Sequence, residues 1–582
     1  MTEGMPINNE EPAAVSVAED PALGLDRRAK LEILLAIMLG LFLGALDQTV
    51  VGTALPKIVT DLGGNDYYVW VVTIYLLTST ITVPYYGALS DLFGRRPLLM
   101  IGISLFLVGS ALSGLSQTMW QLILFRGIQG IGAGALFPIS LAVIGDLFTP
   151  AERGKYQGFF GAVFGLSFLV GPWLGGFLTD NVSWHWVFYV NLPIGIISLL
   201  VIWRLLPNIR KPGATRNIDW LGGAVFAVAV SFFLVGLTNK QSGDWADTAV
   251  GGFIAIGLAL GAVFVFIESR AKVPIIPLDL WRNRTYVSSM LSTFLVSFGF
   301  FGAVIFLPRW FQVVRHESAT NSGYQLLPLL IGLIGASIIS GFIVARTGRY
   351  KLLVLGAIAT MAVGIFLMTN LRTDTDQPHL WLWMFITGLG IGPTLSVFTI
   401  IVQNAVPFQK LGVATSNLTF FRQIGGSVGL AIAGTVFGQS LRDGLPGQVK
   451  PVLGQIVSQV PPQFQAQAQA GLSNLGGGSL DLNSLTGVGQ SFGHSVVSSV
   501  PAQFQVFLSP FIPQLDRAFN DAFSLAVAQS FTLGVVAAVA ALTAALLMRE
   551  IPLRRTTGAE VPASAESRAG SATGIRPAPS TD

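Results

Sequence analysis

The chain contains no cysteine, and only 11% of its 582 residues are charged. Without cysteine, disulfides, thiol catalysis and cysteine-ligated metal sites are excluded. Soluble domains carry about 25% charged residues, whereas this chain is 52% hydrophobic, with a mean hydropathy of +0.65. Apolar stretches of about 20 residues, the length that crosses a bilayer, recur along most of the sequence. The composition therefore predicts an integral membrane protein.

The usual marks of an enzyme or a secreted protein are also missing. The first 30 residues are polar and include Glu10, Glu11 and Glu19, so they lack the pattern of a secretory signal peptide. The four histidines show no metal-ligand spacing, and the sequence has neither a Walker loop nor a carboxylate pair suited to hydrolysis. The net charge of +4 is better explained by membrane topology than by nucleic acid. We therefore expect no enzyme activity, no metal, no cofactor and no nucleic-acid partner, and an ion gradient as the driving force.

The hydropathy pattern predicts fourteen membrane spans. Their expected ranges are 31–55, 68–89, 97–116, 119–146, 155–179, 186–206, 220–238, 249–267, 286–308, 323–345, 351–371, 380–402, 411–438 and 523–548. An even number places both termini on one side. Of the 34 Lys and Arg, 24 lie on that side and 8 on the other, while Arg126 and Arg422 lie within spans. Because basic residues mark the cytoplasmic side, we expect a protein of the inner (cytoplasmic) membrane with both termini inside the cell.

An internal repeat predicts two related halves. GALSDLFGRRP (87–97) follows the second span and GFIVARTGRYK (341–351) follows the tenth, so that Gly87, Gly94 and Arg95 align with residues 341, 348 and 349. Transporters are often built from such repeats, although two unrelated helix ends would be the alternative. We expect an all-α membrane protein with two six-helix bundles and two inserted helices. The expected domains are an N-terminal tail (1–30), an N-terminal bundle (31–206), a linker with helices 7 and 8 (207–285), a C-terminal bundle (286–438 and 523–548), an extracytoplasmic insert (439–522) and a disordered tail (549–582).

The insert 439–522 is rich in Gln, Ser, Gly and Pro and poor in charge. It holds a weak repeat, since IVSQVPPQFQ at 456–465 resembles VVSSVPAQFQ at 496–505. Two interpretations remain open. The insert is either a disordered loop or contains amphipathic helices in 450–460 and 503–523, lying on lipid or capping the exit.

Charge inside the membrane marks the first candidate site. Of 30 Asp and Glu, only Asp47 lies deep within a predicted span, where a carboxylate is costly unless it is paired, hydrated or protonated. Arg126 in the fourth span is expected at a similar depth, so the two can meet directly or through water and Gln129. Low dielectric favours the protonated carboxyl, and a nearby guanidinium favours the ionised one. Movement of Arg126 would therefore switch Asp47 between proton uptake and release, unless the pair only joins two helices.

Glycine patterns mark two further candidates. In GAVFGLSFLVGPWLGGFLTD (161–180), Gly171 and Gly175 lie one turn apart and allow close helix approach, and Pro172 is expected to kink the helix. This segment is either a tight hinge on the central cavity or ordinary glycine packing. In the 87–97 loop, Asp91 is expected to bond the next helix's amides or to pair with Arg95 or Arg96, latching the cytoplasmic face closed.

Weaker candidates for the cavity lie in the second half. Arg422 and Gln423 fall inside the thirteenth span, where they either line the cavity or pack and snorkel. The ninth span is rich in phenylalanine, and we take Phe298 and Phe301 as candidate lining residues, although each could face lipid instead.

These motifs together resemble the major facilitator superfamily, and more narrowly its fourteen-span drug/proton antiporter family. LDQTVVGTALP resembles the family's span-one motif, which implies that Asp47 is protonated, and LILFRGIQGIGAG resembles the span-four motif, which ties Arg126 to proton transfer. GALSDLFGRRP matches the superfamily's gate loop, which implies gate roles for Gly87, Asp91, Gly94, Arg95 and Arg96. GPWLGG resembles the core of the antiporter motif and assigns Gly171, Pro172, Gly175 and Gly176 to it, although Ser167 replaces its usual leading glycine.

The resemblance spans about residues 30–440 and 523–550 and omits the insert. It implies proton-driven export of small amphipathic or lipophilic compounds by alternating access, with protons as the only coupling ion. One alternative is an exporter of an endogenous lipid or glycolipid, with an envelope partner at 439–522 and membrane lipid as a further contact. A more remote alternative is a non-transporting membrane scaffold.

Overall fold

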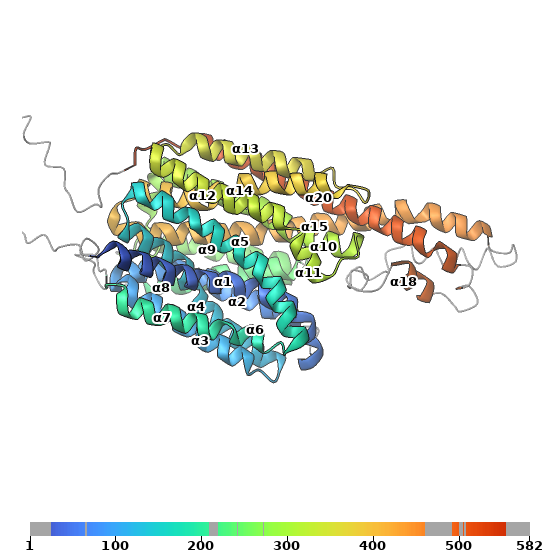
Figure 1. The fold of residues 1–582 in the computed structure, drawn as a ribbon, viewed down its shortest axis with the longest axis horizontal. Coiled ribbons are helices and arrows are strands. Elements are labelled where there is room, and N and C mark those ends of the chain that lie inside the picture. The colour runs from blue at the N-terminus through green and yellow to red at the C-terminus, as the bar shows by residue number, and fades with distance from the viewer. Residues whose placement is uncertain are drawn as a thin grey trace, which may run out of the picture.

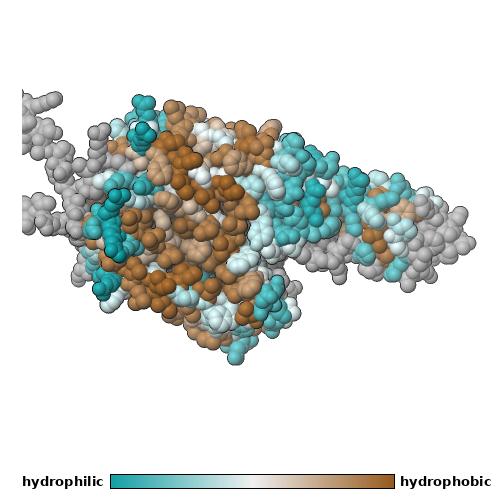
Figure 2. Space-filling view, viewed as in Figure 1, coloured by the Kyte–Doolittle hydropathy of each residue, from teal (hydrophilic) through white to brown (hydrophobic). Residues whose placement is uncertain are grey.

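The computed structural model describes residues 25–63, 67–208, 219–240, 243–271, 273–459, 492–499, 505 and 508–553, and these are almost entirely helical, with no strand among them. The helices lie side by side along the long axis of the molecule (Figure 1). Figure 2 shows a broad apolar band across the visible face, with hydrophilic surface toward both ends, the pattern of a membrane-embedded body. Thirteen of the described helical segments are long and apolar enough to cross a membrane.

The N-terminal bundle consists of seven helical segments. They are α1 (Arg27–Leu62), α2 (Tyr68–Phe93), α3 (Arg95–Gly114), α4 (Met119–Leu147), α5 (Pro150–Asn181), α6 (Trp186–Tyr189) and α7 (Asn191–Leu205). The predicted sixth span is thus divided at Val190 into a short and a longer helix. With 26 residues, α2 is about 39 Å long at 1.5 Å per residue, but it is not among the thirteen segments that are apolar enough to count as membrane spans.

The C-terminal bundle packs against the first with the same kind of architecture (Figure 1). Its helices are α10 (Arg284–Val314), α11 (Ala319–Tyr324), α12 (Leu327–Thr347), α13 (Lys351–Met368), α14 (Gln377–Ala405), α15 (Leu411–Gln459) and α20 (Ile512–Leu546). Between the bundles in sequence, α8 (Trp220–Asn239) and α9 (Phe253–Glu268) form a hairpin, and α8 packs against α2 and α15. The predicted fold class is therefore confirmed.

Local sequence signals explain several helix starts. Thr149 and Glu152 form a reciprocal capping box at the start of α5, with Pro150 in its first turn. Asn283 accepts hydrogen bonds from the first amides of α10. Pro172 lies inside α5, where a membrane helix tolerates the lost backbone donor.

Two helices run past the ends of the predicted spans. The sequence predicts a thirteenth span over 411–438 and a fourteenth over 523–548, whereas α15 continues to Gln459 and α20 begins at Ile512. The two helices project together beyond the bundle, with α18 (Phe492–Ser499) packed on α20 (Figure 1). Residues 450–459 and 512–523, which fall in the segments expected to form helices, are helical here. A buried apolar stripe continues along α15 beyond residue 438 and is formed by Leu441, Leu445, Val449, Leu453 and Ile456.

Other expectations fall on residues outside the described part of the chain. These include most of the N-terminal tail 1–30, the tail from residue 554 onward and most of the repeat within the insert. We call the end of the molecule where α1 begins and α20 ends the basic end, and the opposite end the hairpin end. The basic end is the one predicted to be cytoplasmic.

Candidate functional site

The centre of the site is the carboxylate of Asp47 in α1. Arg126 of α4 donates from Nη1 to Asp47 Oδ2 at 2.5 Å, and Gln129 donates from Nε2 to Oδ1 at 2.8 Å. Asn191, at the start of α7, donates from Nδ2 to the same Oδ1 at 3.3 Å. Each of these four side chains is exposed by 1% or less. The structure thus brings Asp47, Arg126 and Gln129 into direct contact inside one bundle.

Arg126 has partners besides Asp47. Its Nη1 also donates to Gln129 Oε1 at 2.8 Å, and its Nε donates to the carbonyl of Val71 at 3.4 Å. The guanidinium carbon lies 4.1 Å from the centroid of the Tyr75 ring, a cation–π arrangement. Arg126 is therefore stabilised from α2 and from its own helix as well as by the carboxylate.

The sequence interpretation missed Asn191. Its Nδ2 also donates to Ser110 Oγ at 3.0 Å, and Ser110 donates in turn to the carbonyl of Phe188 at 2.8 Å. These contacts fix the side-chain amide so that its N–H groups face Asp47. The available signal was a polar amide inside an apolar predicted span, the same signal that drew attention to Asp47.

The chemistry open to this cluster is proton exchange on Asp47. Two opposite charges in a dry site neutralise each other, whereas removal of one partner leaves an uncompensated charge that costs about 3–5 kcal/mol. If Asp47 takes up a proton, Arg126 still has Gln129, Val71 and Tyr75 as partners. The site can therefore hold Asp47 in either protonation state without exposing the guanidinium.

A second cluster lies at the basic end. Arg95, which is fully buried, pairs through Nη2 with Asp91 Oδ1 at 2.7 Å and through Nε with Asp146 Oδ2 at 2.7 Å. Asp91 also accepts hydrogen bonds from the amides of Gly412 at 3.3 Å and Val413 at 3.0 Å. These amides belong to the first turn of α15, so one carboxylate joins the two bundles. Arg96 is half-buried and is not among the groups that these contacts join.

The amides bound by Asp91 differ from those expected. The sequence predicts either amides of the next helix, α3, or an arginine as the partner of Asp91. The pair with Arg95 is present, whereas the amides belong to α15 of the other bundle. The physical reason is Gly87, one turn earlier, where an added Cβ would collide with Ser416 of α15. This close approach brings the start of α15 under Asp91. Gly94, with φ 98°, provides the left-handed turn that separates α2 from α3.

Buried amides add to the closure of the basic end. Gln157 of α5 donates to Gln403 Oε1 of α14 at 2.9 Å, and Gln403 donates to the carbonyl of Leu141 in α4 at 3.0 Å. Both glutamine side chains are nearly fully buried between the bundles. This pair was not predictable from the sequence, because a glutamine near a helix end is usually solvated.

The glycines of α5 face two partners. An added Cβ on Gly171 would collide with Thr49 of α1, and one on Gly175 would collide with Thr53. The predicted close helix approach therefore exists, and its partner is the helix that carries Asp47. On the neighbouring surface, Pro172 and Gly176 lie against α11 of the C-terminal bundle. This part of α5 thus contacts both halves of the molecule.

The candidate cavity residues are distributed over α10 and α15. Arg422 donates from Nη2 to the carbonyl of Leu395 at 3.4 Å, and Gln423 has a buried Oε1 without a partner. The Phe301 ring packs against Gly426, and the backbone of Phe298 packs against Gly429. These four residues lie in the C-terminal bundle, and none is among the contacts of Asp47.

The sequence comparisons decide the family. A family model described as the Major Facilitator Superfamily matches residues 37–430. The chain belongs to the Major Facilitator Superfamily. Within this superfamily, it is 38% identical over 481 residues to the multidrug transporter protein MdtP of Bacillus subtilis (strain 168), covering 82% of this chain and 87% of that protein. Multidrug resistance protein 3 of the same strain is 37% identical over 420 residues, covering 71% of this chain and 82% of that protein.

A solved structure of another superfamily member supports the same fold. The human organic anion transporter MFSD10 (TETRAN) superposes with a TM-score of 0.54 at 16% identity, covering 70% of this chain and 94% of that chain. This likeness concerns the fold alone. Together with the helices and the relatives, it establishes the chain as a multi-pass membrane transporter of the Major Facilitator Superfamily.

Proposed function

We propose that this transporter is a proton-driven exporter of amphipathic or lipophilic compounds across the cytoplasmic membrane. The observation that carries the proposal is the buried contact between Asp47 and Arg126, with two amides that complete the carboxylate's environment. The names of two relatives, a multidrug transporter and a multidrug resistance protein, support the substrate class. The basic residues of the sequence support an orientation with the basic end in the cytoplasm.

In the proposed cycle, a proton from outside the cell binds to Asp47 and releases Arg126 from its ion pair. Arg126 then relies on Gln129, the Val71 carbonyl and the Tyr75 ring, which are already within reach. Loss of one buried ion pair changes how α1 and α4 are held together. When the proton leaves toward the cytoplasm, the pair re-forms and resets the bundle.

The second proposed step is opening of the basic end to receive substrate from inside the cell. For this, Asp91 must leave the amides of Gly412 and Val413, and Gln157 must separate from Gln403. The contact of Gly171 and Gly175 with α1 couples α5 to the helix of Asp47. Because α5 also packs against α12, a shift of α1 has a direct route to the interface between the bundles.

Reconstituted transport tests this proposal. The purified protein is placed in proteoliposomes with an imposed proton gradient, and ethidium movement and lumenal pH are followed together. We expect ethidium flux with proton counterflow in the wild type and loss of both in Asp47→Asn. Asp244→Asn is the matched control, because that carboxylate is 85% exposed. If Asp47→Asn retains proton counterflow, Asp47 is not the coupling site.

An exporter of endogenous lipid or glycolipid is the second candidate. The observation that favours it is the α15–α20 hairpin, which projects beyond the bundle and offers a surface to an envelope partner or to a departing lipid (Figure 1). A well-folded wild type that moves no ethidium, together with altered envelope lipids after gene deletion, would support this alternative. A scaffold without transport would show neither effect.

A further inference from the structure

The inserted hairpin ends in a second buried acidic site, far from Asp47 in sequence. Asp219 caps α8, accepting from the Gly222 amide at 2.8 Å through Oδ1. Glu268, the last residue of α9, accepts from the Ile276 amide at 2.6 Å through Oε1. Each carboxyl group thus accepts a hydrogen bond from a backbone amide through one of its oxygens. Their other oxygens, Asp219 Oδ2 and Glu268 Oε2, are buried and have no hydrogen-bond donor.

These two free oxygens face each other. Both lie within 3.0 Å of the point where a Cβ on Gly222 would stand, and the side chains are in hydrogen-bonding range of one another. Glu268 is 2% exposed. Two ionised carboxylates in such a position would repel each other in a region of low dielectric, so the arrangement requires a positive partner between them.

No described side chain supplies that positive charge. Among the described residues, the only charged group that acts on Glu268 is Asp219. Arg270, two residues beyond the end of α9, has its guanidinium carbon 4.2 Å from the centroid of the Phe266 ring. Tyr85 of α2 faces both acids, yet its hydroxyl donates to the carbonyl of Gly223. The Ile275 amide also faces Glu268, and it supplies a neutral donor only.

We propose that Asp219 and Glu268 share one proton and form a second proton-binding site at the basic end. One carboxyl group carries the proton and donates it to the other, which satisfies both free oxygens. On deprotonation, the O–H bond breaks, the proton passes to solvent at the basic end, and two adjacent carboxylates remain. The site stands apart from Asp47 and does not depend on the proposed direction or substrate of transport.

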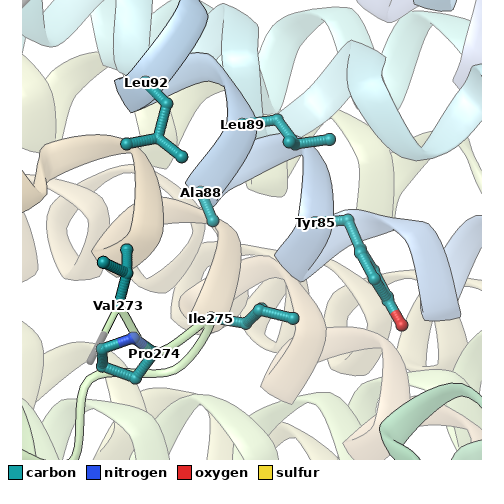
Figure 3. A pocket seen from close by; sticks show the side chains of 7 residues that line it. All are labelled: Tyr85, Ala88, Leu89, Leu92, Val273, Pro274 and Ile275. Atoms are coloured by element: carbon teal, nitrogen blue, oxygen red, sulfur yellow. The ribbon is translucent and has the colours of Figure 1, made fainter. Parts of the chain in front are cut away.

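The structure also indicates what the shared proton controls. Residues 273–277, here called the strap, connect α9 to the C-terminal half, and Glu268 holds the strap at the Ile276 amide. Ile275 and Ile276 are buried among side chains of α2, α8 and α15. Figure 3 shows Val273, Pro274 and Ile275 of the strap across a small cavity from Ala88, Leu89 and Leu92 of α2.

This cavity of about 20 Å³ separates the strap from α2, so packing there is incomplete. Tyr85 borders the same cavity and ties α2 to α8 through Gly223. A charged acid pair would repel across Gly222 and pull Glu268 away from the strap. The shared proton therefore fastens the connection between the two halves against α2, and its loss loosens that connection.

Two measurements on the full-length protein in lipid nanodiscs test the proposal. Infrared difference spectra across a pH titration, recorded in the Asp47→Asn background so that Asp47 adds no carboxyl band, should show a protonated-carboxyl band that is lost at alkaline pH and is absent when Glu268→Gln is added. Hydrogen exchange of the strap amides, corrected for the intrinsic pH dependence of exchange, should accelerate by about tenfold at alkaline pH in the wild type. This factor corresponds to a difference of roughly one pKa unit between the closed and the opened strap. In Glu268→Gln, which is neutral and keeps a hydrogen-bond acceptor, strap exchange should not change with pH.

Asp219→Asn serves as the second variant if Glu268→Gln does not fold, and it should also remove the pH dependence. The exposed Asp244→Asn should behave as the wild type does. A band that persists in both acid-pair variants, or strap exchange that is independent of pH in the wild type, would overturn the proposal. Strap protection that depends on the concentration of a metal cation, without a protonated-carboxyl band, would replace the proton by that cation and also overturn it.

Discussion

Arg126 has more partners than the carboxylate that it neutralises. Asp47 is held by three donors, all from the N-terminal bundle, while Arg126 also has the Val71 carbonyl and the Tyr75 ring. This asymmetry means that the arginine can remain buried when the acid is neutral. A pair that served only to join two helices would not need these additional partners, and they therefore favour the proton-exchange interpretation.

Replacement of Arg126 by alanine should abolish proton-coupled transport. Asp47 would then be a buried carboxylate with amide donors only, and the cost of an uncompensated charge, about 3–5 kcal/mol, would keep it protonated. We expect the variant to insert into the membrane normally and to lose proton counterflow in proteoliposomes. Arg28→Ala, which removes an arginine whose side chain is 86% exposed, is the control and should retain counterflow. Undiminished coupling in Arg126→Ala would exclude this arginine from the mechanism.

Asn191 should tune the same step to a smaller degree. Its N–H group stabilises the ionised form of Asp47, so Asn191→Ala favours proton uptake and should move the midpoint of the pH–transport curve to higher pH. Because the hydrogen bond is long, at 3.3 Å, we expect a shift of less than about one pH unit, or about 1.4 kcal/mol. Ser110→Ala leaves the Asn191 amide in place and should give a smaller shift. A midpoint that moves to lower pH would contradict this role.

Helix ends join the two bundles at the basic end. Asp91 binds the first amides of α15, where the helix dipole and unsatisfied N–H groups favour a carboxylate. The acid was predictable from its place in a glycine–arginine loop. Its partner helix was not, because sequence spacing does not say which of fourteen spans will approach Gly87.

Neutralising Asp91 should open the basic end. Asp91→Asn keeps an oxygen that can accept from Val413, yet it loses the ion pair with Arg95 and the attraction to the helix dipole. Because the native chain has no cysteine, spin labels can be placed at Arg204→Cys and Arg349→Cys, one on each bundle. We expect the distance distribution between the labels to shift to longer values, with a roughly tenfold change in population for about 1.4 kcal/mol.

The control for the gate is Asp279→Asn. Asp279 pairs with Lys410 near the start of α15 at 2.5 Å, but its side chain is 61% exposed. An exposed ion pair contributes little, about 0–1 kcal/mol, so the distribution should remain that of the wild type. If both variants open the basic end equally, the effect is general electrostatics and not the capping of α15 by Asp91.

At the scale of the whole molecule, the features that were predictable from the sequence are those that the bilayer imposes. Span length, basic residues and intramembrane charge depend on the bilayer, and from them followed the two bundles, the inserted hairpin and the equal depth of Asp47 and Arg126. Contacts between distant segments were not predictable, such as Asn191 with Asp47 or Gln157 with Gln403. The helical continuation of α15 stayed one of two open interpretations, because its polar, proline-containing sequence beyond residue 438 conceals an apolar stripe that is recognisable only against α20.

That stripe makes the projecting hairpin part of the core of the C-terminal bundle. Ile456 is fully buried, as is Leu515 of α20, and Phe519 stacks on Phe492 of α18 with ring centroids 4.9 Å apart. The Gly493 amide donates to Asp516 at 2.7 Å, which ties α18 to α20. The apolar core is thus continuous from the membrane into the hairpin.

Truncation of Ile456 should loosen the projecting α15–α20 hairpin without affecting proton coupling. Removing a buried isoleucine side chain costs about 2–5 kcal/mol, and this loss falls where, among the described helices, α15, α18 and α20 pack together. In Ile456→Ala, we expect faster hydrogen exchange in residues 441–459 and 512–523, with unchanged exchange in α1 and α4 and unchanged proton counterflow. Its exposed neighbour provides the control variant Gln455→Ala, which should match the wild type. Loss of counterflow in Ile456→Ala alone would instead make the hairpin a working part of the transport cycle.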